Sequence, residues 1–351
     1  MHLLKKKIKD LQVNKNESIT RAIEKINLSK IKIIFVVDDA NKLVGSITDG
    51  DIRRTILKKK NINLKVLDVM NKNVKYFYKN IKDHYRYKDY FRIKLFCIPV
   101  INKSKKILFY LVKNDHVVEN FDNTIFLMAG GKGLRLYPLT KFIPKPLLKI
   151  NNIPIIERII ENFKKQGFNN FKVSINYLGS KIKQYLEKRK NLSVTINFIR
   201  EKKFLGTAGS LSIAKVNELV FPIILTNSDL ISNINYKRLL DFHIKNKSDL
   251  TICVRNQIFE MPYGEIYLEG KKVSKIIEKP ISNSIVNAGV YVLSKKILKL
   301  TKPNKHLMMN ELINLSIKNN CKILSFPIYE NWIDVGNKDQ LLKAKKFKLA
   351  K

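Results

Sequence analysis

Hydrophobic positions in the first sixty residues follow first a helical and then a strand period. An apolar stripe with helical spacing follows Ser18, which is the expected N-cap. The stripe consists of Ile19, Ala22, Ile23 and Ile26. Two apolar runs at 33–37 and 43–48 then flank a polar turn at 38–42, and an acidic segment at 49–51 opens the next helix. The predicted order is helix, strand, turn, strand, helix.

From residue 124 onward, apolar runs of strand length alternate with helical stripes. One helix is expected to begin at Pro154 and to end at Gly167. The expected strands cover 125–128, 171–175, 194–199, 222–226, 250–255 and 289–293. This alternation predicts an α/β domain with a Rossmann-like mixed, mostly parallel sheet flanked by helices. Ligands of such sheets bind beyond the carboxyl ends of the strands, so motifs at those ends are candidates for chemistry.

The length and composition of the chain indicate how many domains to expect and whether the protein is a membrane or secreted protein. A chain of 351 residues, 45% of them apolar, favours two domains with a core each. The longest apolar run, 219–225, contains a proline and is far below the ~18 residues that span a bilayer, so no membrane helix is expected. Residues 1–10 lack the apolar core of a secretion signal. The three cysteines are odd in number and widely spaced, so we expect buried thiols in a cytoplasmic protein.

The formal net charge of +39 raises the question of nucleic-acid or anionic-lipid binding. Lysines are scattered along the whole chain, and their longest runs are the three-residue runs at 5–7 and 58–60. No recognised nucleic-acid-binding motif accompanies the charge. We therefore expect no specific nucleic-acid partner and no membrane partner.

The segment 126–140 reads F-L-M-A-G-G-K-G-L-R-L-Y-P-L-T and is the most informative in the chain. Its three glycines follow an apolar strand and let backbone N–H groups approach an anion closely, because no Cβ blocks the approach. Arg135, and Lys145 between two prolines, add positive charge. The spacing is neither that of a Walker loop nor that of a dinucleotide fingerprint. The pattern predicts a cradle for a triphosphate.

The form G-G-x-G-x-R-L-x-P-L-T, followed by P-K-P, resembles the signature of the sugar-1-phosphate nucleotidyltransferases. The resemblance implies catalytic roles for Arg135 and Lys145 and a set of nucleotide-binding residues. That set is Ala129, Gly130, Gly131, Gly133, Glu201, Gly206, Thr207 and Gly209. The segment 205–209, L-G-T-A-G, resembles guanylyl- and uridylyltransferases more than thymidylyltransferases. Taken alone, it is also typical of a helix start with Thr207 as cap.

Two aspartates form the expected metal site. Asp229 follows the apolar run 223–225, and Asp334 lies in W-I-D-V-G, which resembles the family's W-x-D-x-G. Mg²⁺ prefers oxygen ligands and screens the charge of a triphosphate, so the resemblance implies that both aspartates hold Mg²⁺. Family members usually carry glycine before the first aspartate, where this chain has Ser228. Either aspartate alone is equally consistent with a surface or capping role.

Three further motifs resemble the sugar side of the same family. Gly264 lies in Y-G, Glu278 and Lys279 in E-K-P, and Asn287 and Gly289 in N-A-G-V-Y. The resemblance implies that these residues bind the sugar and its phosphate. Together the motifs cover residues 124–351, which we assign to a catalytic domain.

The N-terminal third resembles a pair of CBS motifs. The first copy carries F-V-V-D-D and L-V-G-S-I-T-D-G-D-I-R-R, and a second copy runs from residue 64 to about 119. The resemblance implies that Thr48 and Asp51 bind an adenine nucleotide, although Asp51 as a helix cap is an equally open alternative. In the second copy, Phe109 and Val112 stand where glycine and Thr or Ser are expected, and only Asp115 remains in register. Residues 1–120 are the expected regulatory domain.

The family resemblance implies a complete reaction, in which NTP and a sugar 1-phosphate give an NDP-sugar and pyrophosphate. The sugar phosphate attacks the α-phosphorus in line, so catalysis is positioning and charge stabilisation. A CBS pair joined to this transferase is most similar to the guanylyltransferases that supply GDP-glucosamine for bacterial nonulosonic acids, so GTP and glucosamine 1-phosphate are the favoured substrates. Mannose-1-phosphate guanylyltransferase is one alternative, and a catalytically inactive nucleotide-sensing CBS protein is another. A homo-oligomer is expected.

Overall fold

The structure is a computed structural model that describes residues 3–6, 11–29, 31, 33–59, 64–79, 97–113 and 120–346. The chain divides into two compact units. One consists of Met1–Val117 with Asn256–Val286, and the other of Val118–Arg255 with Asn287–Lys351.

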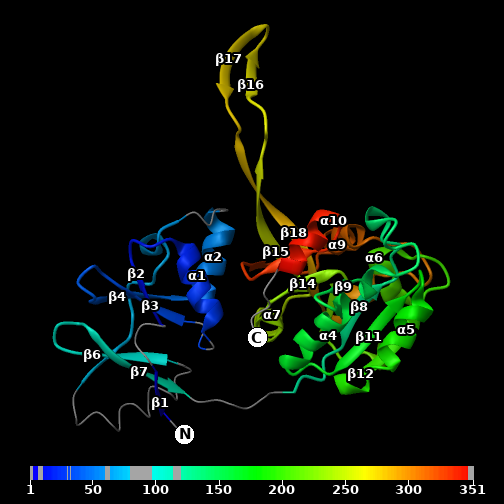
Figure 1. The fold of residues 1–351 in the computed structure, drawn as a ribbon, viewed down its shortest axis with the longest axis horizontal. Coiled ribbons are helices and arrows are strands. Elements are labelled where there is room, and N and C mark those ends of the chain that lie inside the picture. The colour runs from blue at the N-terminus through cyan, green and yellow to red at the C-terminus, as the bar shows by residue number, and fades with distance from the viewer. Residues whose placement is uncertain are drawn as a thin grey trace. The chain divides into compact units, whose positions relative to one another are not determined.

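A seven-stranded mixed sheet organises the larger unit (Figure 1). In spatial order its strands are β12 (Thr195–Arg200), β11 (Asn170–Ile175), β8 (Ile125–Ala129), β13 (Ile223–Asn227), β18 (Ile281–Leu293), β15 (Leu250–Glu260) and β19 (Ile323–Ile328). The first four strands pair in parallel, β13 pairs with β18 antiparallel, and β15 pairs with β19 in parallel. The predicted mixed, mostly parallel α/β sheet is therefore confirmed.

Helices cover both faces of this sheet because the strand residues alternate between two cores. In β8, Ile125 and Leu127 belong to one core, while Phe126 between them belongs to the other. The first core is completed by α4 (Ile155–Lys165), α5 (Gly179–Glu187), α7 (Tyr236–Lys245) and α10 (Lys338–Lys346). The second is completed by α6 (Gly206–Gly209), α8 (Lys295–Leu298) and α9 (Met309–Lys318). The period of two along each strand thus produces three layers.

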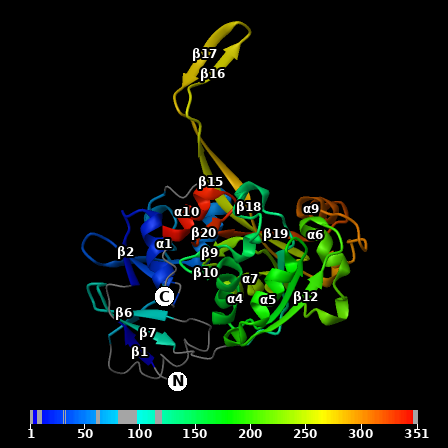
Figure 2. The same cartoon turned by 45° about the vertical axis from the view of Figure 1, so that its right-hand side comes forward.

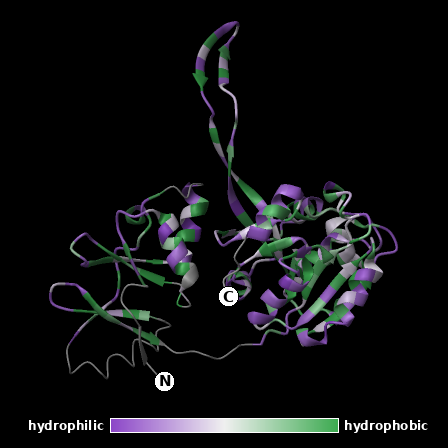
Figure 3. Cartoon of the chain, viewed as in Figure 1, coloured by the Kyte–Doolittle hydropathy of each residue, from purple (hydrophilic) through white to green (hydrophobic). Residues whose placement is uncertain are grey.

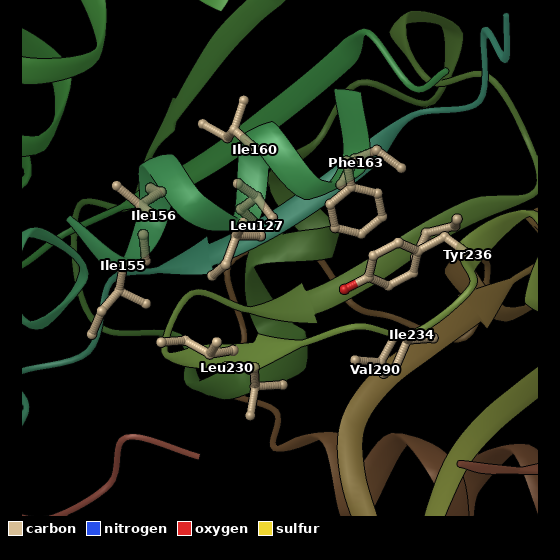
Figure 4. Close-up of a cluster of buried hydrophobic side chains, with 14 of the residues drawn as sticks. Leu127, Ile155, Ile156, Ile160, Phe163, Leu230, Ile234, Tyr236 and Val290 are labelled. Carbon is tan, nitrogen blue, oxygen red and sulfur yellow. The ribbon is translucent and has the colours of Figure 1, made fainter. Parts of the chain in front are cut away.

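The first core contains the bulkiest packing of the unit. Phe163 of α4 stacks on Tyr236 of α7 with ring centroids 3.7 Å apart, and both lie over Leu127 and Val290 of the sheet (Figure 4). Figure 2 shows α4 and α5 on the same face. The central strands are mostly apolar, whereas the helices carry a polar side as well (Figure 3). Burial of this face fixes the strand ends from which the site is built.

Several predicted elements differ in their ends. The helix expected at Pro154 begins at Ile155, because Pro154 is its N-cap with an extended backbone. β15 and β18 are longer than the predicted runs 250–255 and 289–293. Strand β19 of the large sheet was not predicted. Four short strands were also not predicted, namely β9 (Lys149–Ile150) paired with β10 (Ile153–Pro154), and β14 (Leu230–Ser232) paired with β20 (Trp332–Asp334).

The N-terminal part of the other unit follows the predicted order. Its elements are β1 (Leu3–Lys6), β2 (Gln12–Asn14), α1 (Ile19–Leu28), β3 (Ile33–Val37), β4 (Leu43–Thr48), α2 (Asp49–Lys59), β5 (Phe77–Tyr78), β6 (Cys97–Ile101) and β7 (Ile107–Lys113). Ser18 is the N-cap of α1, as predicted, and accepts a hydrogen bond from the Arg21 amide. The resemblance to a CBS pair implies a small α+β region, and this mixture of helices and strands is confirmed.

An internal repeat is visible in the strand register. Val13 pairs with Val36, and Phe77 with Val100, so the second pair lies 64 positions after the first. The same offset relates the turns, since Asn41 and Lys105 both have φ of 59°. It also places Phe109 opposite Val100 where Gly45 lies opposite Val36. The departures expected in the second copy therefore occupy equivalent positions, although Asp115 lies outside the described residues.

Residues 256–286 contain an antiparallel ribbon of β16 (Glu265–Glu269) and β17 (Lys272–Ile277) (Figure 1). Many of its apolar side chains are exposed, including Tyr263, Leu268 and Ile276. A two-stranded ribbon buries little apolar surface of its own.

Two remaining expectations concern composition. Cys97 and Cys253 are buried, but Cys321 is only half-buried, so the expectation of buried thiols is wrong for this residue. It directly follows the turn that ends α9, where the chain returns to the surface. Within the described ranges, no helix is long and apolar enough to cross a membrane.

Candidate active site

A cavity of about 580 Å³ opens at the carboxyl ends of the parallel neighbours β8 and β13. It is lined by Met128, Gly130, Gly131, Lys132, Gly133, Leu134, Arg135, Lys145, Pro146, Glu201, Phe204, Gly206, Thr207, Ser210, Asn227, Ser228, Asp229 and Gly336. Both predicted catalytic cations and most of the predicted nucleotide-binding residues are in this set. The location agrees with the general rule that open α/β sheets bind ligands beyond their strand ends.

The glycine loop tolerates no side chain at two of its positions. Gly133 has φ of +65°, and a Cβ there would lie 3.0 Å from the Thr140 methyl group and 3.2 Å from the Lys145 Cβ. A Cβ on Gly130 would lie 2.8 Å from the Glu201 carboxylate. Thr140 Oγ1 also donates a hydrogen bond of 3.0 Å to the Gly133 carbonyl, which ties the two ends of the loop together. The loop therefore presents backbone rather than side chains to the cavity.

Lys145 reaches the cavity from a short 3-10 turn that the flanking prolines help to form. Its side chain is only 11% exposed and donates a hydrogen bond to Asp229 Oδ2. The same ammonium lies 4.0 Å from Asp334 Oδ1. The buried Lys145 ammonium thus forms ion pairs with both carboxylates.

Asp229 lies in the turn immediately before β14, and Asp334 is the last residue of β20, the strand that pairs with β14. Asp334 pairs with Leu230 in the β14–β20 ladder, and the Val335 amide donates a 3.0 Å hydrogen bond to the Asp229 carbonyl. Burial raises the pKa of Asp334, the Asp229 carboxylate raises it further, and Lys145 and Arg135 oppose the rise. The two carboxylates are therefore close enough to interact electrostatically.

One oxygen of each aspartate lacks a hydrogen bond in the described part of the chain, although the Lys145 ammonium lies 4.0 Å from Asp334 Oδ1. Asp229 Oδ1 and Asp334 Oδ1 are buried, and neither accepts a hydrogen bond there. Such atoms are costly unless something compensates them. Two converging carboxylate oxygens suit a hard divalent cation such as Mg²⁺. No group of three or more His, Cys, Asp or Glu side chains that would hold a metal occurs among the described residues, so further ligands would come from water or substrate.

Arg135 lies beside the same pair. A Cβ on Gly336 would come within 3.2 Å of Arg135 Nη1, so the guanidinium packs against the backbone two residues after Asp334. Glycine at 336 is what permits this approach. Two predicted cations and two predicted carboxylates are thus brought together from four segments of the chain.

Ser228 stands where the resembling family usually has glycine, and its backbone φ is not positive. Its hydroxyl donates a 2.6 Å hydrogen bond to the Met128 carbonyl at the end of β8. The serine is therefore accommodated by tying β13 to β8, with no strain at Asp229.

Glu201 and the glycine segment after it form the opposite wall. The Glu201 carboxylate accepts hydrogen bonds from Ser174 Oγ at 2.6 Å and from the Leu205 amide at 3.1 Å. Thr207 does not cap α6, whose N-cap is Leu205, but accepts a 2.8 Å hydrogen bond from the Met309 amide at the start of α9. The helix-cap alternative for Thr207 is therefore wrong. Gly209 lies close behind, where a Cβ would meet the Lys305 carbonyl at 2.7 Å.

The predicted sugar-side residues divide between the two units. Asn287 and Gly289 belong to the larger unit, and a Cβ on Gly289 would lie 2.9 Å from Asn227 Nδ2 in the cavity wall. Gly264 and Glu278 lie together on the ribbon 256–286, where a Cβ on Gly264 would come within 3.0 Å of Glu278 Oε2. Lys279 follows with φ of +46°. The sugar-binding roles stay predictions.

Sequence reasoning did not select several residues that line the cavity. Asn227 ends β13 next to the predicted aspartate, and Ser210 follows the predicted L-G-T-A-G segment. Phe204 is an exposed aromatic side chain between Glu201 and Gly206. A polar residue at a strand end and an exposed aromatic ring inside a motif were the available signals.

Thr48 and Asp51 are engaged with each other. The Thr48 amide and hydroxyl donate to Asp51 Oδ2 at 2.8 and 2.6 Å, and Asp51 also forms an ion pair with Arg54. This is the reciprocal geometry of a capping box, in which Thr48 precedes α2 and Asp51 is the third residue of the helix, so Asp51 stabilises the helix N-terminus without being its N-cap. A role in nucleotide binding stays a prediction.

Comparison with known protein families matches two parts of the chain. Residues 125–351 match the family described as "Nucleotidyl transferase", and residues 7–58 match the CBS domain. These matches confirm the predicted resemblance to a transferase with an N-terminal CBS region, while the exact domain boundaries stay predictions.

Curated relatives resemble the larger part. The mannose-1-phosphate guanyltransferase of Debaryomyces hansenii is 30% identical over 224 residues, which is 62% of either chain. The catalytic subunit beta of the Xenopus tropicalis mannose-1-phosphate guanylyltransferase is 29% identical with the same coverage. The chain thus spans about three fifths of the length of these relatives.

Among solved structures, HddC from Yersinia pseudotuberculosis superposes with a TM-score of 0.52 at 27% identity. The match covers 64% of this chain and 98% of HddC, and HddC is also known in complex with GMP-PN.

Proposed function

The chain belongs to the nucleotidyl transferase family, and from that premise we propose that it joins a nucleoside triphosphate to a sugar 1-phosphate, giving an NDP-sugar and pyrophosphate. The observation that carries the proposal is the convergence of the glycine loop, Arg135, Lys145 and Asp229 on one cavity, with Asp334 Oδ1 4.0 Å from the Lys145 ammonium behind its wall. Such a cavity offers backbone donors and cations to phosphates and carboxylates to a metal.

The proposed nucleotide is GTP. Support comes from the L-G-T-A-G form of residues 205–209, from relatives named guanyltransferases, and from the GMP-PN complex of HddC. The proposed acceptor is a hexose 1-phosphate. The relatives' names favour mannose 1-phosphate, whereas the N-terminal CBS region favours glucosamine 1-phosphate. A role in bacterial surface-glycan synthesis and a cytoplasmic location are parts of the same proposal.

In the proposed reaction, an oxygen of the sugar phosphate attacks the α-phosphorus of the NTP. A new P–O bond forms, and the bond to the β-phosphate oxygen breaks in line, so pyrophosphate leaves with the electron pair. No side chain becomes a nucleophile, which agrees with a cavity built from cations and backbone donors. Arg135 steadies the leaving pyrophosphate, Lys145 the α-phosphate, and Lys279 the attacking phosphate.

Asp229 and Asp334 would hold Mg²⁺, whose chemistry when bound is to neutralise charge on the triphosphate. Their unpaired oxygens are the reason for this assignment. Lys145, which contacts Asp229, keeps the second carboxylate oxygen oriented. The chain's own contribution is therefore a preorganised arrangement of charge.

The deciding experiment measures pyrophosphate release from the full chain. GTP, UTP, dTTP and CTP are each paired with mannose 1-phosphate, glucosamine 1-phosphate and glucose 1-phosphate, with Mg²⁺ and with excess EDTA. We expect Mg²⁺-dependent turnover with GTP and one of the first two sugars. Absence of turnover in every combination would instead favour the inactive nucleotide-sensing alternative.

A further inference from the structure

A second cavity, of about 680 Å³, lies at the edge strand β12 of the large sheet. It is lined by Lys172, Phe198, Ile199, Arg200, Lys202, Lys203, Leu205, Ile213, Ala214, Lys215, Glu218, Leu219 and Asn304. All of these residues belong to the larger unit. The volume is within the usual range of small-molecule sites, about 300–1,000 Å³.

The charge of this second cavity is strongly unbalanced. Glu218 is the single carboxylate in its lining, and it is shared by Lys172 at 2.7 Å and Lys215 at 3.4 Å. The hydrogen bond from Lys172 is the main reason that the pKa of Glu218 is lowered. The Lys172 side chain is only 8% exposed, so this ammonium is a fixed part of the wall.

The other cationic side chains in the lining differ from Lys172 and Lys215, because they are not paired with a carboxylate among the described residues. Arg200, Lys202 and Lys203 are exposed, and none of them forms an ion pair with any described residue. Three free cations beside an already neutralised carboxylate attract an anion with more than one negative charge.

The floor between these cations is apolar. Leu219 and Ala214 are buried, and the half-buried Ile213 and Phe198 complete the surface. An apolar floor beneath a cationic rim suits a ligand that has a flat ring body and a charged polyphosphate. A nucleoside diphosphate group, free or within a nucleotide sugar, has that chemistry.

The wall that separates this cavity from the glycine-loop cavity is one short segment, residues 201–206. Lys202, Lys203 and Leu205 line the second cavity, whereas Glu201, Phe204 and Gly206 line the first. The segment is braced at its middle, because the Leu205 amide donates to Glu201 and the Leu205 carbonyl accepts from Leu307 at 2.8 Å. A ligand that orders Lys202 and Lys203 therefore acts on the wall of the other cavity.

We propose that the edge-strand cavity binds a nucleoside diphosphate group and that its occupancy changes the affinity of the glycine-loop cavity for its nucleotide. The binding part stands on the geometry of the cavity alone. The coupling part rests on the proposed function of the neighbouring site. Reciprocal coupling of this kind requires that each ligand alter the affinity for the other.

Calorimetric titration of the full chain with GDP tests the binding part. The Lys202→Glu/Lys203→Glu variant is compared with Lys188→Glu/Lys299→Glu, which changes the same charge at exposed positions outside both cavities. We expect the first variant to lose one binding event or to weaken it at least tenfold, and the control to bind as the parent does. Equal binding by both variants overturns the proposal.

Two further arms separate the possible causes. GDP-mannose is expected to compete for the same event as GDP, whereas inorganic pyrophosphate should bind at least tenfold more weakly. If pyrophosphate binds as tightly as GDP, the nucleoside ring contributes nothing to the affinity, and the proposal is overturned. Lys145→Ala should leave this event intact while weakening binding at the glycine loop. If Lys145→Ala changes no GDP binding but the Lys202/Lys203 variant does, the edge-strand site stands and the proposed function of the first cavity fails.

The coupling part is tested by kinetics. In the parent, added GDP should change the KM for GTP through both direct competition and the second site, so the inhibition should depart from a single-site competitive pattern. The Lys202→Glu/Lys203→Glu variant should show simple competition, with turnover in the absence of GDP within a few-fold of the parent. An identical inhibition pattern in parent and variant overturns the coupling.

Discussion

The glycine-loop cavity and the Thr48–Asp51 corner both place a carboxylate near a strand end, but they treat it in opposite ways. Asp51 Oδ2 is satisfied by the amide and hydroxyl of Thr48. Asp229 and Asp334 each retain a buried oxygen without a hydrogen bond in the described structure. The first arrangement stabilises a helix, while the second leaves one oxygen of each carboxylate without a hydrogen bond and so open to a ligand, although Lys145 lies beside both groups. Whether a carboxylate already accepts hydrogen bonds therefore distinguishes a structural role from a ligand-binding role better than the sequence motifs do.

The largest effect is expected from Lys145→Ala, because this buried ammonium is the cation shared by both aspartates. Turnover should fall by about two to three powers of ten, as for the loss of a preorganised donor at a transition state. The measurement is kcat for pyrophosphate release. Lys141→Ala, exposed in the same loop, is the matched control and should stay within a few-fold of the parent. If the Lys145→Ala variant kept near-parental turnover, the glycine-loop cavity would not be the active site.

His243 is a buried titratable side chain that belongs to neither of these two regions. It lies 2.9 Å from Thr251 Oγ1, and burial lowers its pKa to about 4. Since the unfolded chain takes up this proton near pH 6.5 and the folded chain only near pH 4, stability should be complete above pH 6.5 and fall with decreasing pH. The loss due to His243 between pH 7.5 and 5 should be about 2 kcal/mol.

Urea unfolding at both pH values measures this loss. In His243→Gln, the drop in unfolding free energy between the two pH values should be smaller than in the parent by that amount. The exposed His306→Gln is the control and should follow the parent. An unchanged pH dependence in His243→Gln would show that this histidine does not carry the effect.

Asp334→Asn tests the unpaired carboxylate directly. The amide keeps the shape of the side chain but removes the charge, so the Mg²⁺ concentration for half-maximal turnover should rise by about tenfold or more, because hard cations bind charged oxygen ligands more tightly. Asp339→Asn, exposed in the first turn of α10, should not move the Mg²⁺ curve. The same curve for parent and Asp334→Asn would exclude Asp334 as a ligand.

The smallest effect is expected at Asp51, where the carboxylate is already satisfied. Asp51→Ala removes the bonds from Thr48 and should lower the free energy of unfolding by about 1 kcal/mol, as for other helix caps. Chemical denaturation measures the change, with exposed Asp39→Ala as a control for loss of charge. Turnover without adenine nucleotides should stay near the parental value. If Asp51→Ala leaves stability unchanged but abolishes adenine-nucleotide binding, the corner is a ligand site after all.

Local patterns predicted much of the fold. The helical stripe after Ser18 and the strands at 33–37 and 43–48 were found where expected, since short-range periodicity determines which face is buried. The parallel strands β8, β11, β12 and β13 were found within about two residues of their predicted ends, whereas β15 is longer than predicted and β19 was not predicted. The short pair β14–β20 was not predicted, because its strands are about a hundred positions apart and only a tertiary fold pairs them.

The sequence by itself determined the glycine loop, the order of strands and helices and the identity of the charged groups, because each of these depends on neighbouring residues. Only the tertiary structure decided that Asp229 and Asp334 converge on Lys145, and that Ser228 and Thr207 form hydrogen bonds to distant backbone. It also decided that the single segment 201–206 separates two cavities. These facts arise where segments remote in the chain are packed against one another, and no local pattern records that contact.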